Sequence, residues 1–237
     1  MISDIMKQRT VAAEKTTARS KFQRYKADDA KVMRPSSVRE SSNMTLLREA
    51  WAKVEVDPDK NVDYPYRTAV ELVKPIRYTI KDVERFSISM GGFQDEKNFS
   101  TKAGFFLSAL INMGKGKNYV VHTASMQIHY LGYANTKYLR VKGDAGQMLG
   151  WGMKSGKIVV EGDAGSDVGR CMVDGKIVIK GNAGREIGTL QSGGEIHLLK
   201  DYETVAWERD TFAKVFHRWK LIAAGEWISR DAKTKEG

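Results

Sequence analysis

Histidine, cysteine and carboxylate side chains come first in a search for chemistry, because they supply most general bases, nucleophiles and metal ligands. Glu195 and His197 lie on one predicted strand, but no serine or cysteine is placed to complete a triad with them. We interpret the single cysteine, Cys171, as a small buried hydrophobic residue, with a nucleophile as the alternative. No nucleophile or metal motif includes any of the histidines, which are His122, His129, His197 and His217. The sequence therefore predicts no catalytic, cofactor-binding or metal-binding residue in this chain.

Clustered glycines raise the separate question of a phosphate-binding loop. A P-loop needs a glycine, four further residues and then Gly-Lys-Ser or Gly-Lys-Thr. Here Gly156-Lys157 and Gly175-Lys176 are each followed by isoleucine, and no Gly-x-Gly-x-x-Gly opens a predicted helix. Regular recurrence at a structural corner explains these glycines more simply, and phosphate binding is the alternative.

The glycines belong to an internal repeat with a step of 19 residues. Lys142-Gly143-Asp144-Ala145-Gly146 recurs as Glu161–Gly165 and again as Lys180–Gly184. Short β-branched runs between the glycine clusters are typical of strands. Such a repeat buries its apolar face only by stacking on its neighbours, so we expect a parallel β-helix of about four coils over residues 118–200. The predicted strands are 138–142, 157–161, 176–180 and 195–199.

Apolar residues recur at three positions of the repeat, which we expect to face inward. The first two columns are two residues apart on each strand and so share a face. The columns are Leu139, Ile158, Ile177 and Ile196; Val141, Val160, Ile179 and Leu198; and Leu149, Val168 and Ile187.

A further step back of 19 residues gives an irregular first coil. It places Val120 and His122 in the two inner strand columns and Leu131 at the position of Gly150. We interpret His122 as a packed or hydrogen-bonded residue near the end of the stack, with a metal ligand as the alternative.

The opposite strand face carries charges and valines. Lys142, Glu161 and Lys180 alternate in sign, which predicts a ladder of charge pairs between neighbouring strands. The adjacent outer column needs a cover, either a flanking helix or another subunit. Its members are Val121, Arg140, Val159, Val178 and His197.

The Gly-Asp/Asn-Ala-Gly clusters, each with a further glycine four residues on, resemble the GXGXG family of β-helices. That family includes the C-terminal domain of the glutamate synthase large subunit and one of the subunits of formylmethanofuran dehydrogenase. The resemblance implies a right-handed parallel β-helix that packs against catalytic domains and holds no catalytic residue. Glutamate synthase activity needs an N-terminal cysteine, a flavin barrel and an iron–sulfur cluster. This chain starts with Met1-Ile2 and has one cysteine, so such activity would reside in partner chains that carry flavin, iron–sulfur or molybdenum/tungsten cofactors.

The flanks of the repeat define two further regions. Residues 1–117 begin with a polar arm over 1–42 and continue with a predicted helix over 45–54, with Leu46, Leu47, Ala50 and Trp51 on one side. Pro58, Pro65 and Pro75 predict a loop region, in which Tyr64-Pro65-Tyr66 either contacts a partner or packs onto the chain.

Two more helices precede the repeat and one follows it. One is expected to start at Thr79, with Asp82 completing a capping box, and the next runs from a Ser100 cap to Met113 and closes the first coil. Residues 201–237 predict an amphipathic helix over 202–224 and a tail. That helix caps the stack, or docks another subunit through Trp207 and Trp219.

Bulk composition limits the classes of function. One cysteine in 237 residues excludes a disulfide scaffold within the chain and suits the cytoplasm, and no apolar run is long enough to span a membrane. The net charge of +10 comes from scattered basic residues, which favours a solvated surface or an acidic protein partner over nucleic acid. We expect a non-catalytic assembly subunit of a larger enzyme complex. The alternatives are an accessory subunit that shapes a channel or active site, and a basic nucleic-acid-binding protein.

Overall fold

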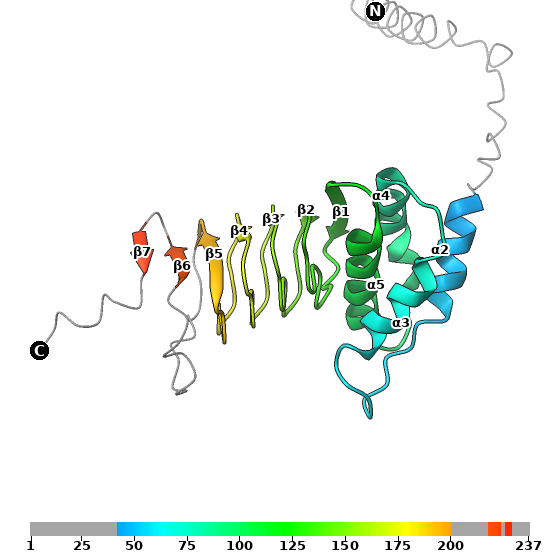
Figure 1. Ribbon diagram of the computed structural model, residues 1–237, viewed down its shortest axis with the longest axis horizontal. Helices are drawn as coiled ribbons and strands as arrows, with labels where there is room; N and C mark the ends of the chain where they lie inside the picture. Colours follow the sequence, from blue (N-terminus) through cyan, green and yellow to red (C-terminus); the bar gives the residue numbers. More distant parts are fainter. Residues whose placement is uncertain (1–41, 201–217, 224–225, 229–237) are drawn as a thin grey trace, which may run out of the picture. The chain divides into compact units, whose positions relative to one another are not determined.

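A computed structural model describes residues 42–200, 218–223 and 226–228 (Figure 1). The predicted polar arm over 1–42 lies outside these residues except for Ser42. Helices come first along the chain and strands follow. The helices are α2 (Ser42–Ala52), α3 (Tyr64–Val73), α4 (Ile80–Ser89), the 3₁₀ helix η2 (Met90–Phe93) and α5 (Phe99–Met113). The strands are β1 (Asn118–Ala124), β2 (Tyr138–Gly143), β3 (Lys157–Val160), β4 (Lys176–Ile179), β5 (Gly193–Leu198), β6 (Arg218–Ala223) and β7 (Glu226–Ile228).

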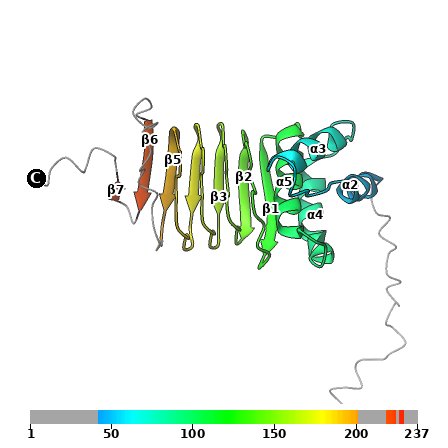
Figure 2. The ribbon, with the colours of Figure 1, turned by 90° about the horizontal axis from the view of Figure 1, so that it is seen from below.

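The strands β1 to β5 pair in parallel, each with the next in sequence, and form a β-solenoid of about four turns (Figure 2). From β2 to β5 the register advances by the 19-residue step, with Leu139 opposite Ile158 and Ile158 opposite Ile177. The prediction of stacked parallel coils is therefore confirmed.

All three predicted inner columns are buried, and none of their side chains is more than 1% exposed. Their burial removes a continuous apolar stripe from water, which is the main driving force for stacking. The same hydrophobic core continues into the helices, from Leu198 in β5 to Met44 in α2.

The first coil differs from its prediction, because it is one residue longer on the strand side. Tyr119 pairs with Leu139 and Val121 with Val141, twenty residues apart, and a register shift follows between His122 and Ala124. The inner residues are thus Tyr119 and Val121, both buried.

The prediction placed Val120 and His122 inside the coil and Val121 outside it. This is wrong, since Val121 is buried and Val120 and His122 are only half-buried. The predicted glycine position is also wrong. Leu131 belongs to the third apolar column, because its carbonyl accepts from Gly150 N–H as that of Leu149 accepts from Gly169. Gly132, with a φ of +75°, takes the corner position that the repeat predicts for Leu131.

The helices lie together at the β1 end of the stack (Figures 1 and 2). On α5, Ser100 C=O accepts from His129 N–H, and Ser108 Oγ donates to Tyr130 C=O. On α4, Ser87 Oγ accepts the N–H of His122 at 3.0 Å, which satisfies a backbone donor on the open edge of β1. The prediction that a helix ending at Met113 closes the first coil is confirmed, although the N-cap is Asn98 rather than Ser100.

Local capping and proline chemistry explain the other helices. Thr79 Oγ1 accepts Asp82 N–H while Asp82 Oδ2 accepts Thr79 N–H, so the predicted capping box is confirmed. Burial acts to raise the pKa of Asp82, but hydrogen bonds from Thr79 and Asn43 outweigh it and hold that pKa below its usual value. The predicted loop around Pro65 is wrong, because α3 covers Tyr64–Val73. Proline is tolerated in a first helical turn, and Ala69 and Val73 then bury one face of the helix.

The helix expected over 202–224 is wrong for its last part. Residues 201–217, including Trp207, lie outside the described residues, but 218–223 form strand β6, parallel to β5, and β7 returns antiparallel to β6. The open edge of β5 offers unpaired backbone groups, and a strand satisfies them where a helix would not.

Candidate functional site

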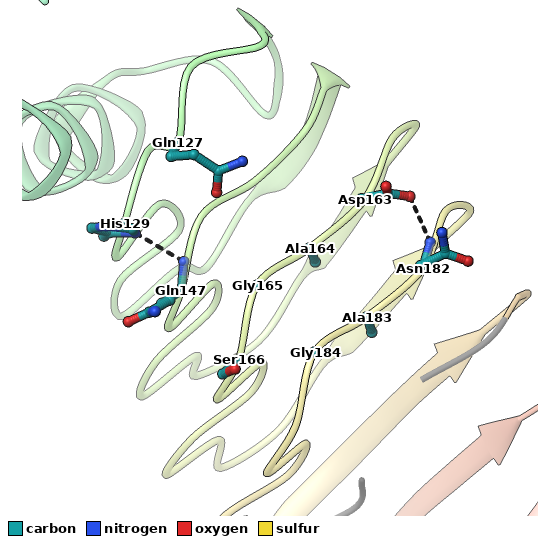
Figure 3. A pocket seen from close by; sticks show the side chains of 10 residues that line it. All are labelled: Gln127, His129, Gln147, Asp163, Ala164, Gly165, Ser166, Asn182, Ala183 and Gly184. Carbon is teal, nitrogen blue, oxygen red and sulfur yellow. Dashed lines mark hydrogen bonds between the residues drawn. The ribbon is translucent and has the colours of Figure 1, made fainter. Parts of the chain in front are cut away.

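Polar side chains of the repeated corner bind the next coil (Figure 3). Asp144 Oδ1 accepts the N–H of Asp163 at 2.8 Å, and Asp163 Oδ1 accepts the N–H of Asn182 at 2.7 Å. Ala145, Ala164 and Ala183 continue this ladder as isolated parallel bridges. The acidic residue of one repeat is thus a structural acceptor for the following one.

The glycines before Asp163 and Asn182 have a matching steric reason. A Cβ at Gly162 would overlap Asp144 Oδ1, and a Cβ at Gly181 would overlap Asp163 Oδ1. Neither glycine has a positive φ. Close approach of consecutive coils, rather than a ligand, therefore accounts for the Gly-Asp/Asn pair.

Substitution at Asp163 tests this structural role. We expect Asp163→Ala to lower the free energy of unfolding by about 1 kcal/mol, because it leaves the Asn182 N–H without its acceptor. Asp163→Asn keeps an acceptor oxygen and introduces the residue type found at the same repeat position, Asn182, so it should change stability by less than about 0.5 kcal/mol. Urea unfolding of both variants checks this, and an equal loss in both would show that the charge matters.

A shallow groove of about 310 Å³ runs along this corner (Figure 3). His129 borders it, with Nδ1 accepting Gln147 N–H at 3.0 Å, and burial lowers the pKa of His129, which favours the neutral ring. Ser166 Oγ accepts Arg185 N–H at 3.4 Å. The groove combines polar and apolar lining, with Asp163 as the one acid among its lining residues, and it suits hydrogen bonding rather than acid–base chemistry. The repeat pattern does not predict this groove, because Gln127 and His129 belong to the irregular coil.

The other described histidines and Cys171 lie at separate places in the structure and form no common site. His197 Nε2 lies 2.9 Å from Glu195 Oε2, whose pKa is lowered by hydrogen bonds from His197 and Lys176. His122 Nε2 lies 3.0 Å from Glu84 Oε1, so the prediction of a hydrogen-bonded residue near the end of the stack is confirmed. Cys171 is half-buried rather than fully buried. His217 lies outside the described residues, and within those residues no three His, Cys, Asp or Glu gather as a metal ion would require.

The outer face of the sheet is the second candidate surface, and its true column is Val120, Arg140, Val159, Val178 and His197. The described helices lie at the β1 end of the stack, away from the strands β3 to β5 that hold most of this column (Figure 2). Arg140 is the strand partner of Val159, and its guanidinium binds Glu161, two residues beyond Val159. The aliphatic stem of Arg140 therefore runs beside Val159, which is only 8% exposed.

The charge ladder on this face pairs differently from its prediction. Glu161 binds Arg140 rather than Lys142 or Lys180, although all three cations lower its pKa, with the Arg140 hydrogen bond as the main cause. Lys142, Lys157 and Lys180 make no ion pair with a described residue, so the face is basic.

The candidate aromatic contact packs onto its own chain. The Tyr66 ring lies 4.9 Å from that of Tyr133, and Asn112 Nδ2 donates to the Tyr66 hydroxyl. Trp151 lies beside Tyr133, and Arg170 lies over the Trp151 ring. The same-chain alternative for Tyr64–Tyr66 therefore holds for Tyr66.

Comparison with known proteins adds no assignment. Among the described residues, no helix combines the length and the apolar character needed to cross a membrane. No family model, no curated protein and no solved structure matches this chain.

Proposed function

We propose that this chain is a non-catalytic structural subunit of a larger enzyme complex. One observation carries the proposal: the recurrent polar residues of the repeat are hydrogen-bonded to the next coil. Asp144 binds Asp163 N–H and Asp163 binds Asn182 N–H, so the polar chemistry of the corner serves stacking. A hydrogen-bonded stack with a basic, partly apolar outer face is suited to positioning other chains.

The resemblance to GXGXG β-helices supports the same proposal. It would make the solenoid right-handed and its partners the catalytic chains of a glutamate-synthase-like or one-carbon redox enzyme. Flavin, iron–sulfur or molybdenum/tungsten cofactors would then lie in those partners, in the cytoplasm. The groove beside Gln147 and Ser166 favours a second candidate, in which this chain forms part of a channel or active-site wall.

Native mass of the protein from its own cells, purified gently at low salt, tests the proposal. We expect a hetero-oligomer that contains a cofactor-bearing chain, since a structural subunit acts only when it is bound to the catalytic chains that it positions. A monomer or a homo-oligomer under these conditions contradicts the proposal, and so does turnover by the purified chain alone.

A further inference from the structure

The exposed side of α4 combines apolar residues with cations. Asp82, Val83, Phe86 and Ser87 are buried, which leaves the opposite arc of the helix facing solvent. That arc holds Ile80, Lys81, Glu84, Arg85 and Ile88, and we call these residues the α4 surface.

A largely apolar groove of about 790 Å³ adjoins one end of the α4 surface, where Ile80 borders it together with Tyr78 and Tyr119. The Tyr78 hydroxyl donates to Leu110 C=O at 2.8 Å, and the Tyr119 hydroxyl accepts Gly116 N–H at 3.0 Å. Burial raises the pKa of both tyrosines, so both remain neutral. Of these lining residues Ile80 is exposed, Tyr78 is half-buried and Tyr119 is almost fully buried. A bulky apolar side chain of a ligand would therefore contact mainly Ile80 and Tyr78.

The apolar surface extends beyond the groove. Ile80 is 39% exposed and Ile88 is 59% exposed. They are eight residues apart on one helix, a separation of about 12 Å along its axis. Two apolar contacts at this distance suit a protein segment that runs along α4.

The charges around these apolar residues are mostly positive. Lys81, Arg85 and Lys115 make no ion pair with a described residue, and Lys81 and Lys115 line the groove. The one acid of the α4 surface, Glu84, also lines the groove and is hydrogen-bonded to His122, so Lys81 and Lys115 outnumber it there. A segment with acidic residues beside its apolar ones would complement both features.

We infer that the α4 surface and its groove dock an acidic amphipathic segment of a partner protein, with one bulky apolar side chain of that segment in the groove. The inference rests on the proposed role as a subunit that binds other chains, and it names the chemistry of one partner. Nucleic acid fits less well, since a phosphate backbone offers no apolar side chain to the groove or to Ile88.

Peptide binding to the full chain tests this inference. The probe is a synthetic helical peptide of about four turns, with leucines seven residues apart and glutamates on both flanks. One control peptide has the same composition in scrambled order, and another carries lysine in place of glutamate. Fluorescence anisotropy at low and high salt measures each Kd.

We expect the acidic peptide to bind more tightly than both controls and to weaken as salt rises. Lys81→Glu with Lys115→Glu should weaken it about tenfold or more, since two attractive contacts become repulsive. Ile80→Ala should also weaken it about tenfold, as loss of an anchor contact does. The matched controls are Lys53→Glu with Lys97→Glu, and Leu46→Ala on α2, which should leave the Kd unchanged. Thermal unfolding of each variant confirms that the fold is retained, and Ile88→Ala replaces Ile80→Ala if that variant unfolds.

Equal binding of the scrambled peptide overturns the inference, and so does unchanged affinity in the charge-reversed variant. Tighter binding of a short DNA duplex or of anionic lipid vesicles at the same residues also overturns it. If the peptide fails to bind while native mass shows a hetero-oligomer, the inference about the α4 surface is overturned and the proposed function stands. If the native mass is that of a monomer, the proposed function itself fails.

Discussion

Gly104→Ala should lower the free energy of unfolding by about 3 kcal/mol or more, because there is no room for a methyl group at this position. A Cβ there would overlap the carbonyl oxygen of His129 and lie 3.0 Å from Leu131 N. These backbone atoms belong to the first coil, and His129 N–H is bonded to Ser100 C=O of the same helix. The usual gain of about 1 kcal/mol for replacing a helical glycine with alanine is too small to compensate.

Gly92→Ala is the matched control for Gly104→Ala. Apart from its neighbours in the chain, no atom lies within 4 Å of a Cβ added at Gly92. Its stability should stay within about 0.5 kcal/mol of the parent protein, since exposed substitutions rarely do more. Guanidinium unfolding compares the two variants. Equal stability of Gly104→Ala and the parent protein would show that α5 does not pack this closely against the first coil.

Ile177→Ala should cost about 3 kcal/mol, through lost burial and a cavity in the middle of the stack. Its side chain is fully buried, and its Cδ1 lies where the corner glycines Gly150 and Gly169 leave space. Neighbouring coils share this contact, so the loss should destabilise more than one coil.

Val178→Ala removes apolar atoms from the next residue, which faces outward and is only half-buried. We expect a loss of about 1 kcal/mol or less. Urea unfolding of Ile177→Ala and Val178→Ala therefore measures which strand face is inside. A larger loss for Val178→Ala would reverse the assignment of the two faces.

The coil stack was predictable from sequence because its physical requirements repeat. Each coil places the same apolar residue above the last, so Ile158 and Ile177 recur at the step that the backbone register adopts. Glycine recurs at the corners for a similar reason: Gly162 and Gly181 each meet an aspartate of the preceding coil, and Gly150, Gly169 and Gly188 all adopt a positive φ. Capping at Thr79 was also predictable, because that interaction is local in sequence.

Prediction failed where an element's environment differs from its neighbours'. The first coil packs against α4 and α5, and its extra residue places Tyr119 rather than Val120 inside. Residues 218–223 pair with the open edge of β5, and the helical spacing of apolar residues in the sequence does not predict that pairing. The two grooves are formed by residues from separate segments, such as Ile80 with Tyr119 and His129 with Ala183, so no local sequence pattern predicts them.

The unequal length of the first coil bears on how the chain finds one alignment during folding. Near-identical repeats permit a strand to pair one full repeat out of place, since the buried columns would match almost as well. The first coil pairs twenty residues from the next, unlike the coils from β2 to β5, and its backbone is bonded to Ser87 and Ser100 of the helices. Each later strand pairs with the one before it, so the alignment of the first coil against the helices determines the alignment of the coils that follow. The irregularity that obscured this coil in the sequence is what makes its place in the stack unique.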